Sequence, residues 1–348
     1  MDGIEFLVLE WNDDLRLAPL DLYLDSRQPR SFSFVSHAHA DHIASHRCSV
    51  ATAQTLALLE RRIGSGGCSI ELPYHADHAV GRDAVLRLLP AGHVLGSAML
   101  HLSCNEGTLL YTGDFKLRES LTLGPAEPAR ADVLVMECTY GNPLFRFPPW
   151  RQVAEELVEL VRAAMEDGRQ PIVLGYSLGK AQELTRILTD AGLVVTLHGA
   201  AWTMHQQYEM LSNPVGPARR YVWEDFHGPE ALDLRERGVL IAPPHVARTP
   251  FVTRFKNPLR IMASGWGMMK NAQYRFGVDR VLPLSDHADF DALMDLIARV
   301  APKKIYTHHG SRDFAERLKM QGFDAQCARP DLRCPGRASA LPTHARAR

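Results

Sequence analysis

Four metal-binding side chains stand within six residues in the run SHAHADH at residues 36–42: His37, His39, Asp41 and His42. The preceding residues, 31–35, alternate in polarity like a strand that enters a core. The first two histidines therefore leave its end two residues apart and project to the same side. Two imidazoles can share one cation there, while the aspartate and the third histidine follow in a turn and can face a neighbouring cation. The run predicts a strand end that forms the floor of a dinuclear metal site.

The alternative for this run is a surface cluster of histidines in which Asp41 caps a helix, since Asp is a good N-cap residue. We favour the metal site because a lone pair of histidines is common, whereas the complete arrangement after a strand is not.

Composition describes an ordinary globular chain and argues against several classes of protein. Its 348 residues suit one elaborated domain or two. No apolar run approaches the roughly twenty residues of a membrane span, and Asp2 and Glu5 lie where a secretory peptide carries positive charge. We therefore expect a cytoplasmic protein with no membrane partner. The six cysteines form no CxxC pair and are expected to be reduced thiols. A formal net charge of −1 argues against coating of nucleic acid by bulk electrostatics.

Three further strand ends carry the remaining ligand types that a dinuclear site needs. Residues 84–90 read as a strand, and His93 follows in a turn of small residues. Residues 108–112 read as a second strand, followed by Asp114, whose carboxylate could bridge two cations. Residues 304–307 read as a third strand and are followed by two candidates for one ligand position: His308 and His309. Each of these residues alone is more typical of a turn or cap, but together with the first cluster they predict one metal centre.

Several further motifs give the chain a family resemblance. The segment ECTYG at residues 137–141 is similar to the first signature of the β-CASP branch of the metallo-β-lactamase superfamily, and SDHAD at residues 285–289 is similar to the second. The pair His309–Gly310 resembles the third signature, which implies that His309 rather than His308 is the ligand. Residues 171–184 resemble the strand and helix that begin the inserted β-CASP domain. The resemblance covers residues from about 20 to about 320 and is strongest to bacterial ligase-associated DNA exonucleases.

The resemblance implies an α/β fold, a four-layered αβ/βα sandwich with an inserted β-CASP α/β domain. Residues 1–145 and 280–325 would form the sandwich and residues 146–279 the insertion, whose alternating helix and strand patterns agree. Residues 326–348 have no hydrophobic period and are expected to form a flexible tail. Asp25, at the end of a strand, would orient the metal loop.

A hydrolytic mechanism follows from the resemblance, with two divalent ions, zinc or manganese, activating a hydroxide. The metal ligands would be His37, His39 and His93 on one ion, Asp41, His42 and His309 on the other, and Asp114 between them. His287, held by Glu137, would stabilise charge or protonate the leaving group. The other interpretation of His287 is a capped turn before Phe290. Weaker candidates for substrate contact are Ser177, Lys180 and His198; Lys180 stands where many members of the branch have Arg.

The resemblance leaves more than one substrate open. It favours a metal-dependent phosphodiesterase acting on single-stranded DNA, an exonuclease of DNA repair with a DNA ligase or helicase as partner. The main alternative is an RNA endonuclease or 5′-exonuclease of the mRNA-processing type. A hydrolase of small esters is less favoured, because a small substrate needs neither the insertion nor the motif around His287. A non-catalytic scaffold is also less favoured, because every ligand position is filled.

Overall fold

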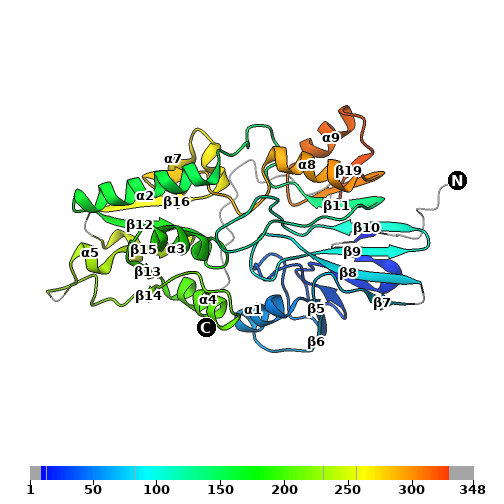
Figure 1. The fold of residues 1–348 in the computed structure, drawn as a ribbon, viewed down its shortest axis with the longest axis horizontal. Helices are drawn as coiled ribbons and strands as arrows, with labels where there is room; N and C mark the ends of the chain where they lie inside the picture. Colours follow the sequence, from blue (N-terminus) through cyan, green and yellow to red (C-terminus); the bar gives the residue numbers. More distant parts are fainter. Residues whose placement is uncertain (1–8, 13, 82, 230, 256, 329–348) are drawn as a thin grey trace.

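Two β-sheets pack face to face in one half of the molecule, and a third sheet forms the other half (Figure 1). The computed structural model describes residues 9–328 except residues 13, 82, 230 and 256. The predicted tail lies largely outside these residues. Within the described chain, the mixed α/β architecture agrees with the fold class expected from the sequence.

The first sheet of the sandwich has six strands in sequential order: β1 (Leu9–Asn12), β2 (Asp14–Leu17), β3 (Leu22–Leu24), β4 (Ser33–Phe34), β5 (Cys48–Ala51) and β6 (Cys68–Glu71). The second sheet has the order β19-β18-β11-β10-β9-β8-β7. Its strands are β7 (His78–Val80), β8 (Ala84–Pro90), β9 (Ala98–Cys104), β10 (Gly107–Tyr111), β11 (Val133–Glu137), β18 (Lys304–His308) and β19 (Ala325–Cys327).

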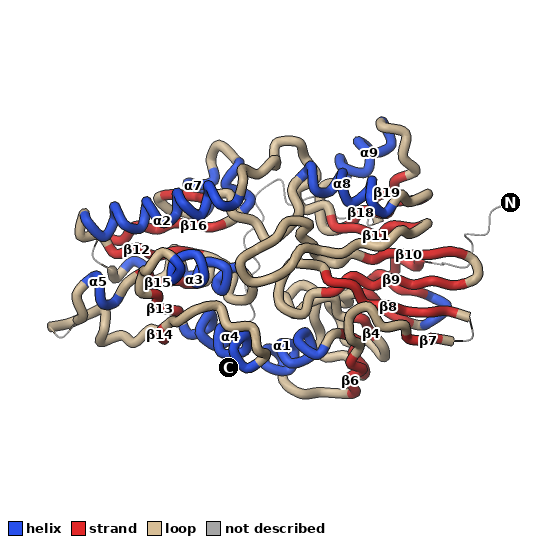
Figure 2. The backbone as a smooth tube through the Cα atoms, in the orientation of Figure 1, coloured by secondary structure: helices blue, strands red, loops and turns tan. Residues whose placement is uncertain are grey.

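Helices cover the outer faces of both sheets, which gives four layers. Helix α1 (Ala53–Ile63) packs beside β5 and β6 of the first sheet. Helices α8 (Phe290–Val300) and α9 (Arg312–Met320) lie on the far side of the second sheet (Figure 2). Strand β11 shows why this arrangement is stable. Its Val133 and Val135 face the core between the sheets, while Leu134 and Met136 face the core under α8 and α9. A strand buried on both faces reads as a continuous apolar run.

The third sheet is parallel in all its pairings and has the order β14-β13-β15-β12-β16-β17. Its strands are β12 (Gln170–Leu174), β13 (Val195–Leu197), β14 (Arg219–Arg220), β15 (Val239–Ala242), β16 (Pro258–Ala263) and β17 (Arg280–Leu282). The associated helices are α2 (Trp150–Glu166), α3 (Lys180–Asp190), α4 (Gly199–Met210), α5 (Leu234–Arg237), α6 (Pro250–Thr253) and α7 (Ala272–Phe276). Apolar cores on both faces of this sheet account for its burial.

The structure moves two of the boundaries expected from the sequence. Strand β17 pairs with β16, so residues 280–282 lie in the third sheet rather than in the sandwich where we placed them. Strand β19 pairs with β18, so residues 326 and 327 belong to the second sheet and not to a tail. A short edge strand of three residues offers little hydrophobic period, which explains both differences.

Strand direction determines where the functional side chains gather. Strands β10, β11 and β18 are parallel to one another, and β8 shares their direction because both β8 and β10 are antiparallel to β9. Strands β3 and β4 of the first sheet are also parallel. The carboxyl ends of parallel strands meet at one edge, which is where loops of α/β proteins form binding sites.

Candidate metal centre

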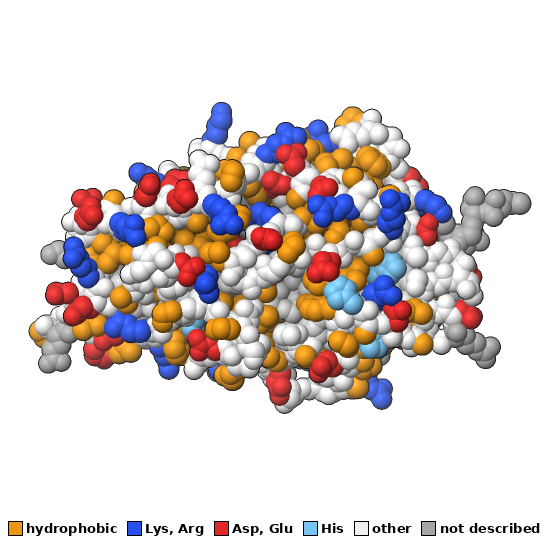
Figure 3. Space-filling view, viewed as in Figure 1, with side chains coloured by type: hydrophobic (Ala, Val, Ile, Leu, Met, Phe, Trp, Pro, Cys, Tyr) orange, Lys and Arg blue, Asp and Glu red, His pale blue; other side chains and the backbone are white. Residues whose placement is uncertain are grey.

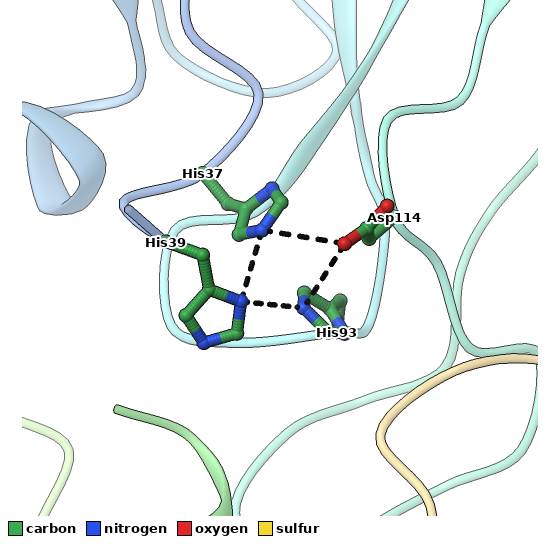
Figure 4. Close-up of side chains that lie close together, drawn as sticks. All are labelled: His37, His39, His93 and Asp114. Carbon is green, nitrogen blue, oxygen red and sulfur yellow. Dashed lines mark hydrogen bonds and ion pairs between the residues drawn. The ribbon is translucent and has the colours of Figure 1, made fainter. Parts of the chain in front are cut away.

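Four polar side chains from three separate loops point toward one another at the edge of the sandwich (Figure 4). His37 and His39 follow β4, His93 follows β8, and Asp114 follows β10. All except His39 are buried, and His39 is partly buried. One ligand atom from each lies within 4.8 Å of the others, so residues far apart in the sequence form a single cluster.

The spacing within this cluster fits a tetrahedral cation. His39 Nδ1 lies 3.1 Å from both His37 Nε2 and His93 Nε2. Asp114 Oδ2 lies 3.6 Å from His37 Nε2 and 3.8 Å from His93 Nε2. Zinc bound tetrahedrally at about 2.0–2.1 Å holds its ligand atoms about 3.3 Å apart. Because the three nitrogens converge on one point, hydrogen bonds among them cannot satisfy all three, whereas one cation can.

The second nitrogen of each of these histidines contacts a fixed acceptor. His37 Nδ1 lies 2.9 Å from the Ser36 hydroxyl oxygen. His39 Nε2 and His93 Nδ1 contact the backbone carbonyl oxygens of Leu178 and Asp286 at 3.1 and 3.0 Å. A ring that donates its outer N–H to such an acceptor presents an unprotonated nitrogen to the cluster, which is the form that binds a metal.

Asp25 organises the loop that carries the histidines. Its carboxylate accepts hydrogen bonds from the Ser36 backbone N–H (2.6 Å), the Ser36 hydroxyl (2.6 Å), the Tyr111 hydroxyl (2.8 Å) and His42 Nδ1 (2.9 Å). Gly113 lets β10 approach this loop, because a Cβ there would lie 2.5 Å from the Ser36 hydroxyl oxygen and its φ is +53°. These contacts fix the loop before any cation binds.

A second group of ligand types adjoins the first: Asp41, His42 and His309. His42 Nε2 lies 3.3 Å from Asp114 Oδ2 and 4.0 Å from Asp41 Oδ2. The ring of His309 stacks on that of His42 with 4.6 Å between centroids, whereas the His308 ring stacks on Tyr111. The structure therefore brings His309, and not His308, into this group. Asp114 belongs to the first group and reaches the second through its 3.3 Å approach to His42 Nε2.

Glu137 and His287 form a third pair beside Asp114. Both carboxylate oxygens of Glu137 lie 3.0 Å from His287 Nδ1, and Asp114 Oδ2 lies 3.9 Å from the same atom. The Phe115 backbone N–H and the Thr139 hydroxyl also donate to Glu137, which is fully buried. This arrangement fixes the orientation of the His287 ring.

The pKa values of the histidines differ according to their neighbours. Burial and the neighbouring imidazoles hold the pKa values of His37 and His93 well below the ordinary value, and burial lowers the pKa of His39. Burial opposes protonation of His42 as well, but Asp114 and Asp25 outweigh it and raise its pKa well above the ordinary value. Burial likewise opposes protonation of His287, yet Glu137 and Asp114 raise its pKa to about 9. Neutral imidazoles beside carboxylates that attract positive charge are suited to a cation.

Two buried polar atoms lack a hydrogen bond among the described residues, although one of them, His42 Nε2, lies 3.3 Å from Asp114 Oδ2. Asp114 Oδ1 and His42 Nε2 are both buried without a hydrogen-bond partner in that part of the chain. An unpaired buried oxygen or nitrogen is costly, and such atoms are common at metal sites. The donor set of imidazoles and carboxylates therefore fits divalent metal ions.

The three candidates for substrate contact lie at the carboxyl edge of the third sheet. Ser177 is partly buried and follows β12. His198 follows β13 and caps α4 by accepting a hydrogen bond from the Ala200 backbone N–H at 3.3 Å. Lys180 requires a correction, because its ammonium is buried in ion pairs with Glu183 (2.7 Å) and Asp286 (2.5 Å) and does not face a substrate phosphate.

Sequence reasoning missed the groups that support the ligands from outside the cluster. Ser36 and Tyr111 hold Asp25, and two backbone carbonyl groups hold the outer nitrogens of His39 and His93. Ser36 adjoins the histidine run and could have been found as its supporting hydroxyl. A backbone carbonyl leaves no signal in residue type.

One family model and several known proteins are similar to this chain in sequence. A family model described as the Zn-dependent metallo-hydrolase RNA specificity domain matches residues 273–327. A probable DNA ligase of Opitutus terrae is 35% identical over 319 residues, which are 91% of this chain and 30% of that protein. An RNase J-like protein of Methanocaldococcus jannaschii is 31% identical over 179 residues, 45% of this chain and 42% of that protein. The transcription termination factor FttA of Methanothermobacter thermautotrophicus is 26% identical over 306 residues, 70% of this chain and 47% of that protein.

The chain spans less than half of the length of each of these relatives. A crystal structure of a protein of unknown function from Enterococcus faecalis V583 has a TM-score of 0.54 and 18% sequence identity, covering 80% of this chain and 75% of that one. The two proteins therefore share a fold. Among the described residues, no helix has both the length and the apolar character needed to cross a membrane.

Proposed function

Because the chain belongs to the β-CASP branch of the metallo-β-lactamase superfamily, we propose that it hydrolyses phosphodiester bonds of nucleic acid with two divalent metal ions. The observation that carries this proposal is the convergence of His37, His39 and His93 with Asp114, whose Oδ2 also lies 3.3 Å from His42 Nε2 of a second group of ligands. Two adjoining cations with one carboxylate between them suit a phosphate ester, whose oxygens need charge neutralisation on both sides.

In this proposal each ion has its own ligands. His37, His39 and His93 would hold one ion, Asp41, His42 and His309 would hold the other, and Asp114 would be available to both. When bound, such ions lower the pKa of water and neutralise charge on the phosphate. Imidazole-rich sites suit zinc, while carboxylate ligands also admit manganese.

The residues around the cluster have separate tasks. Glu137 holds His287 Nδ1, which leaves the other ring nitrogen of His287 to donate a proton to the leaving oxygen. Asp25 keeps the histidine loop in one conformation through its hydrogen bonds with the Ser36 backbone N–H and hydroxyl. Alignment of the leaving oxygen with a positioned acid accelerates such reactions.

The favoured substrate is single-stranded DNA, degraded from an end during DNA repair. This preference rests on the relative named a probable DNA ligase, since the match covers 91% of this chain within one longer polypeptide. Such an arrangement is consistent with a ligase, or a helicase, as a partner that acts on the same DNA. Ser177 and His198 lie at the edge of the third sheet where a strand could pass.

RNA is the second candidate substrate, and a specific observation supports it. The family model that matches residues 273–327 is described as an RNA specificity domain, and two relatives are named for RNase J and for transcription termination. An RNA endonuclease or 5′-exonuclease would use the same metal centre.

The deciding experiment measures degradation of end-labelled single-stranded DNA and RNA of one sequence in the presence of zinc or manganese. We expect metal-dependent shortening of DNA from one end by the intact protein and none by Asp114→Ala. Asp190→Ala, which removes an exposed carboxylate on α3, is the matched control and should behave like the intact protein.

Three other outcomes would change the proposal. Preferential cleavage of RNA would make the chain an RNA-processing enzyme. Hydrolysis of small esters without cleavage of either polymer would indicate a hydrolase of small substrates. Metal binding without any hydrolysis would indicate a scaffold.

A further inference from the structure

A cavity of about 490 Å³ opens beside His287. The proposed hydrolysis assigns no role to it. It lies where three segments meet: the loop after Asp114, the chain that enters α2, and the start of α8. Figure 1 shows α2 over the third sheet and α8 over the sandwich, both in the upper part of the view and on either side of the junction between the two halves. In the same view, Figure 3 shows charged side chains of both signs on this face of the molecule. The volume falls in the range of about 300–1,000 Å³ that is typical of small-molecule sites.

One wall of the cavity is apolar. It is formed by Phe147, Pro148, Pro149 and Trp150. This segment is held firmly, because Asp289 accepts a hydrogen bond from the Phe147 backbone N–H at 3.1 Å and the Phe290 backbone N–H donates to the Phe145 carbonyl oxygen at 3.0 Å. The wall is therefore held in place and presents an apolar surface to a ligand in the cavity.

The charges that line the cavity leave an excess of positive charge. Asp295 is paired with Arg299 at 2.6 Å, and both oxygens of Asp289 accept backbone hydrogen bonds. Arg118 and Arg151 have no ion pair with a carboxylate among the described residues. The cavity thus favours an anion.

The two arginines differ in how they are held. Arg118 Nη2 donates to the Ser285 carbonyl oxygen at 2.9 Å, while its Nη1 is buried without a partner in the described part of the chain. The guanidinium of Arg151 is exposed and lies 4.7 Å from the centroid of the Trp150 ring. A phosphate in the cavity could accept hydrogen bonds from the exposed Arg151 guanidinium, while the buried Arg118 guanidinium adds positive charge nearby.

We propose that this cavity binds one nucleotide of the substrate strand, the one that carries the leaving oxygen. The proposal rests on the proposed nuclease function, because it is His287 that places the cavity on the leaving-group side of the reaction. The base packs against the wall that ends in Trp150, and a phosphate lies beside the Arg151 guanidinium. Stacking on an aromatic side chain tolerates any base, which suits an enzyme that removes nucleotides without regard to sequence.

The test compares Arg151→Ala and Trp150→Leu with the intact protein. Deoxyadenosine 5′-monophosphate is the probe, used as an inhibitor of oligonucleotide cleavage and titrated by calorimetry. Each variant should weaken the binding of the probe and raise the KM for single-stranded oligonucleotide, about tenfold for Arg151→Ala and about fivefold for Trp150→Leu. The KM for oligonucleotide should change more than kcat/KM for bis(p-nitrophenyl) phosphate, which has no nucleoside.

The control is Arg162→Ala, which removes the same charge from the same helix about 16 Å from Arg151. It should leave the KM and the binding of the probe at the values of the intact protein, and melting temperatures will show whether the variants fold. The nucleotide site is wrong if Arg151→Ala and Trp150→Leu bind the probe as tightly as the intact protein does. If the intact protein cleaves neither the oligonucleotide nor bis(p-nitrophenyl) phosphate, the proposed function is wrong, and the calorimetric titration still decides whether the cavity binds a nucleotide.

Discussion

Asp25 shows, at the scale of single residues, that the metal centre depends on a side chain that does not join the cluster itself. Replacing it by asparagine keeps the volume of the side chain. The new amide NH2 group would then face donors from Ser36, Tyr111 and His42, with which it cannot form the same hydrogen bonds. We expect Asp25→Asn to weaken zinc binding about 10- to 100-fold, measured by competition with a chelator. Tyr111→Phe removes one of these hydrogen bonds and should have a smaller effect. Equal zinc affinity in Asp25→Asn and the intact protein would show that the loop is fixed by other contacts.

The pKa of His287 is a second property of one residue that can be measured directly. Burial lowers this pKa, but the Glu137 and Asp114 carboxylates outweigh burial and raise it to about 9. Glu137→Gln removes the negative charge of the carboxylate whose two oxygens lie 3.0 Å from Nδ1, so the pKa of His287 should fall toward the ordinary value of about 6.5. An NMR titration of the imidazole in the metal-free protein measures the change. A pKa that stays near 9 would mean that Asp114 alone holds the proton.

At the scale of elements, a buried group of charges joins α3 to the sandwich. Glu183 pairs with Lys180 on its own helix and lies 3.6 Å from Lys116 Nζ on the loop after Asp114, and Lys180 also pairs with Asp286. Glu183→Gln leaves the Lys116 ammonium buried without a carboxylate partner. We expect the free energy of unfolding to fall by about 3 kcal/mol in urea denaturation.

The matched control for this change lies on the exposed face of the same helix. Asp190→Ala removes a pairing with Arg186 in which both side chains are nearly half exposed, and it should cost less than about 0.5 kcal/mol. Similar small losses for both variants would show that the buried charges contribute little to the attachment of α3.

The pairing of β16 with β17 predicts a dependence of stability on pH. Burial raises the pKa of Asp279, but hydrogen bonds from the Arg260 side chain and backbone outweigh it and lower the pKa below the ordinary value. A carboxyl whose pKa is lower in the folded state stabilises the protein above its unfolded pKa of about 3.9, and this contribution is lost as the pH falls through the folded pKa. Asp279→Asn should therefore cost about 1 kcal/mol at neutral pH and progressively less below about pH 4, measured by urea denaturation at each pH. A constant difference across that range would contradict the assignment.

The elements themselves were largely predictable, and particular residues explain the exceptions. The strand expected at residues 84–90 coincides with β8, because an apolar run bounded by a turn leaves little choice. Residues 280–282 were placed in the sandwich domain but pair with β16 as strand β17, because three residues cannot indicate which neighbour they will pair with. The role of Lys180 was wrong for a different reason. The sequence identified Lys180 as a positive charge near a helix start. It could not show that Glu183 and Asp286 pair with this charge in the folded chain.

At the scale of the whole molecule, metal binding should stabilise the entire fold. The candidate ligands extend from His37 to His309, so a cation there joins strand ends from both sheets of the sandwich. A metal at 100 times its dissociation constant adds about 2.7 kcal/mol to the free energy of unfolding. We expect the melting temperature to rise with zinc concentration in the intact protein and to remain constant in Asp114→Ala, followed by differential scanning calorimetry. An equal rise in both would indicate that zinc binds elsewhere.

The assembly of the site was predictable only in part from the sequence. Ligand residue types stood out because each follows a strand, and the structure places those strand ends together. The cavity beside His287 gave no such signal, since Arg118, Trp150 and Arg299 are ordinary surface residue types until the chain brings them together. Sites made from one motif can be found in the sequence, whereas sites made from three distant segments need the fold.

The backbone carbonyl groups of Leu178 and Asp286 hold the outer nitrogens of His39 and His93. Every amino acid has a carbonyl group, so mutation of either position can change the side chain and still leave this support in place. To keep the metal centre, a related protein must keep the backbone conformation at these two positions, whereas the residue types there are free to change. Related proteins can diverge there in sequence while the same two oxygens continue to set the orientation of both imidazole rings.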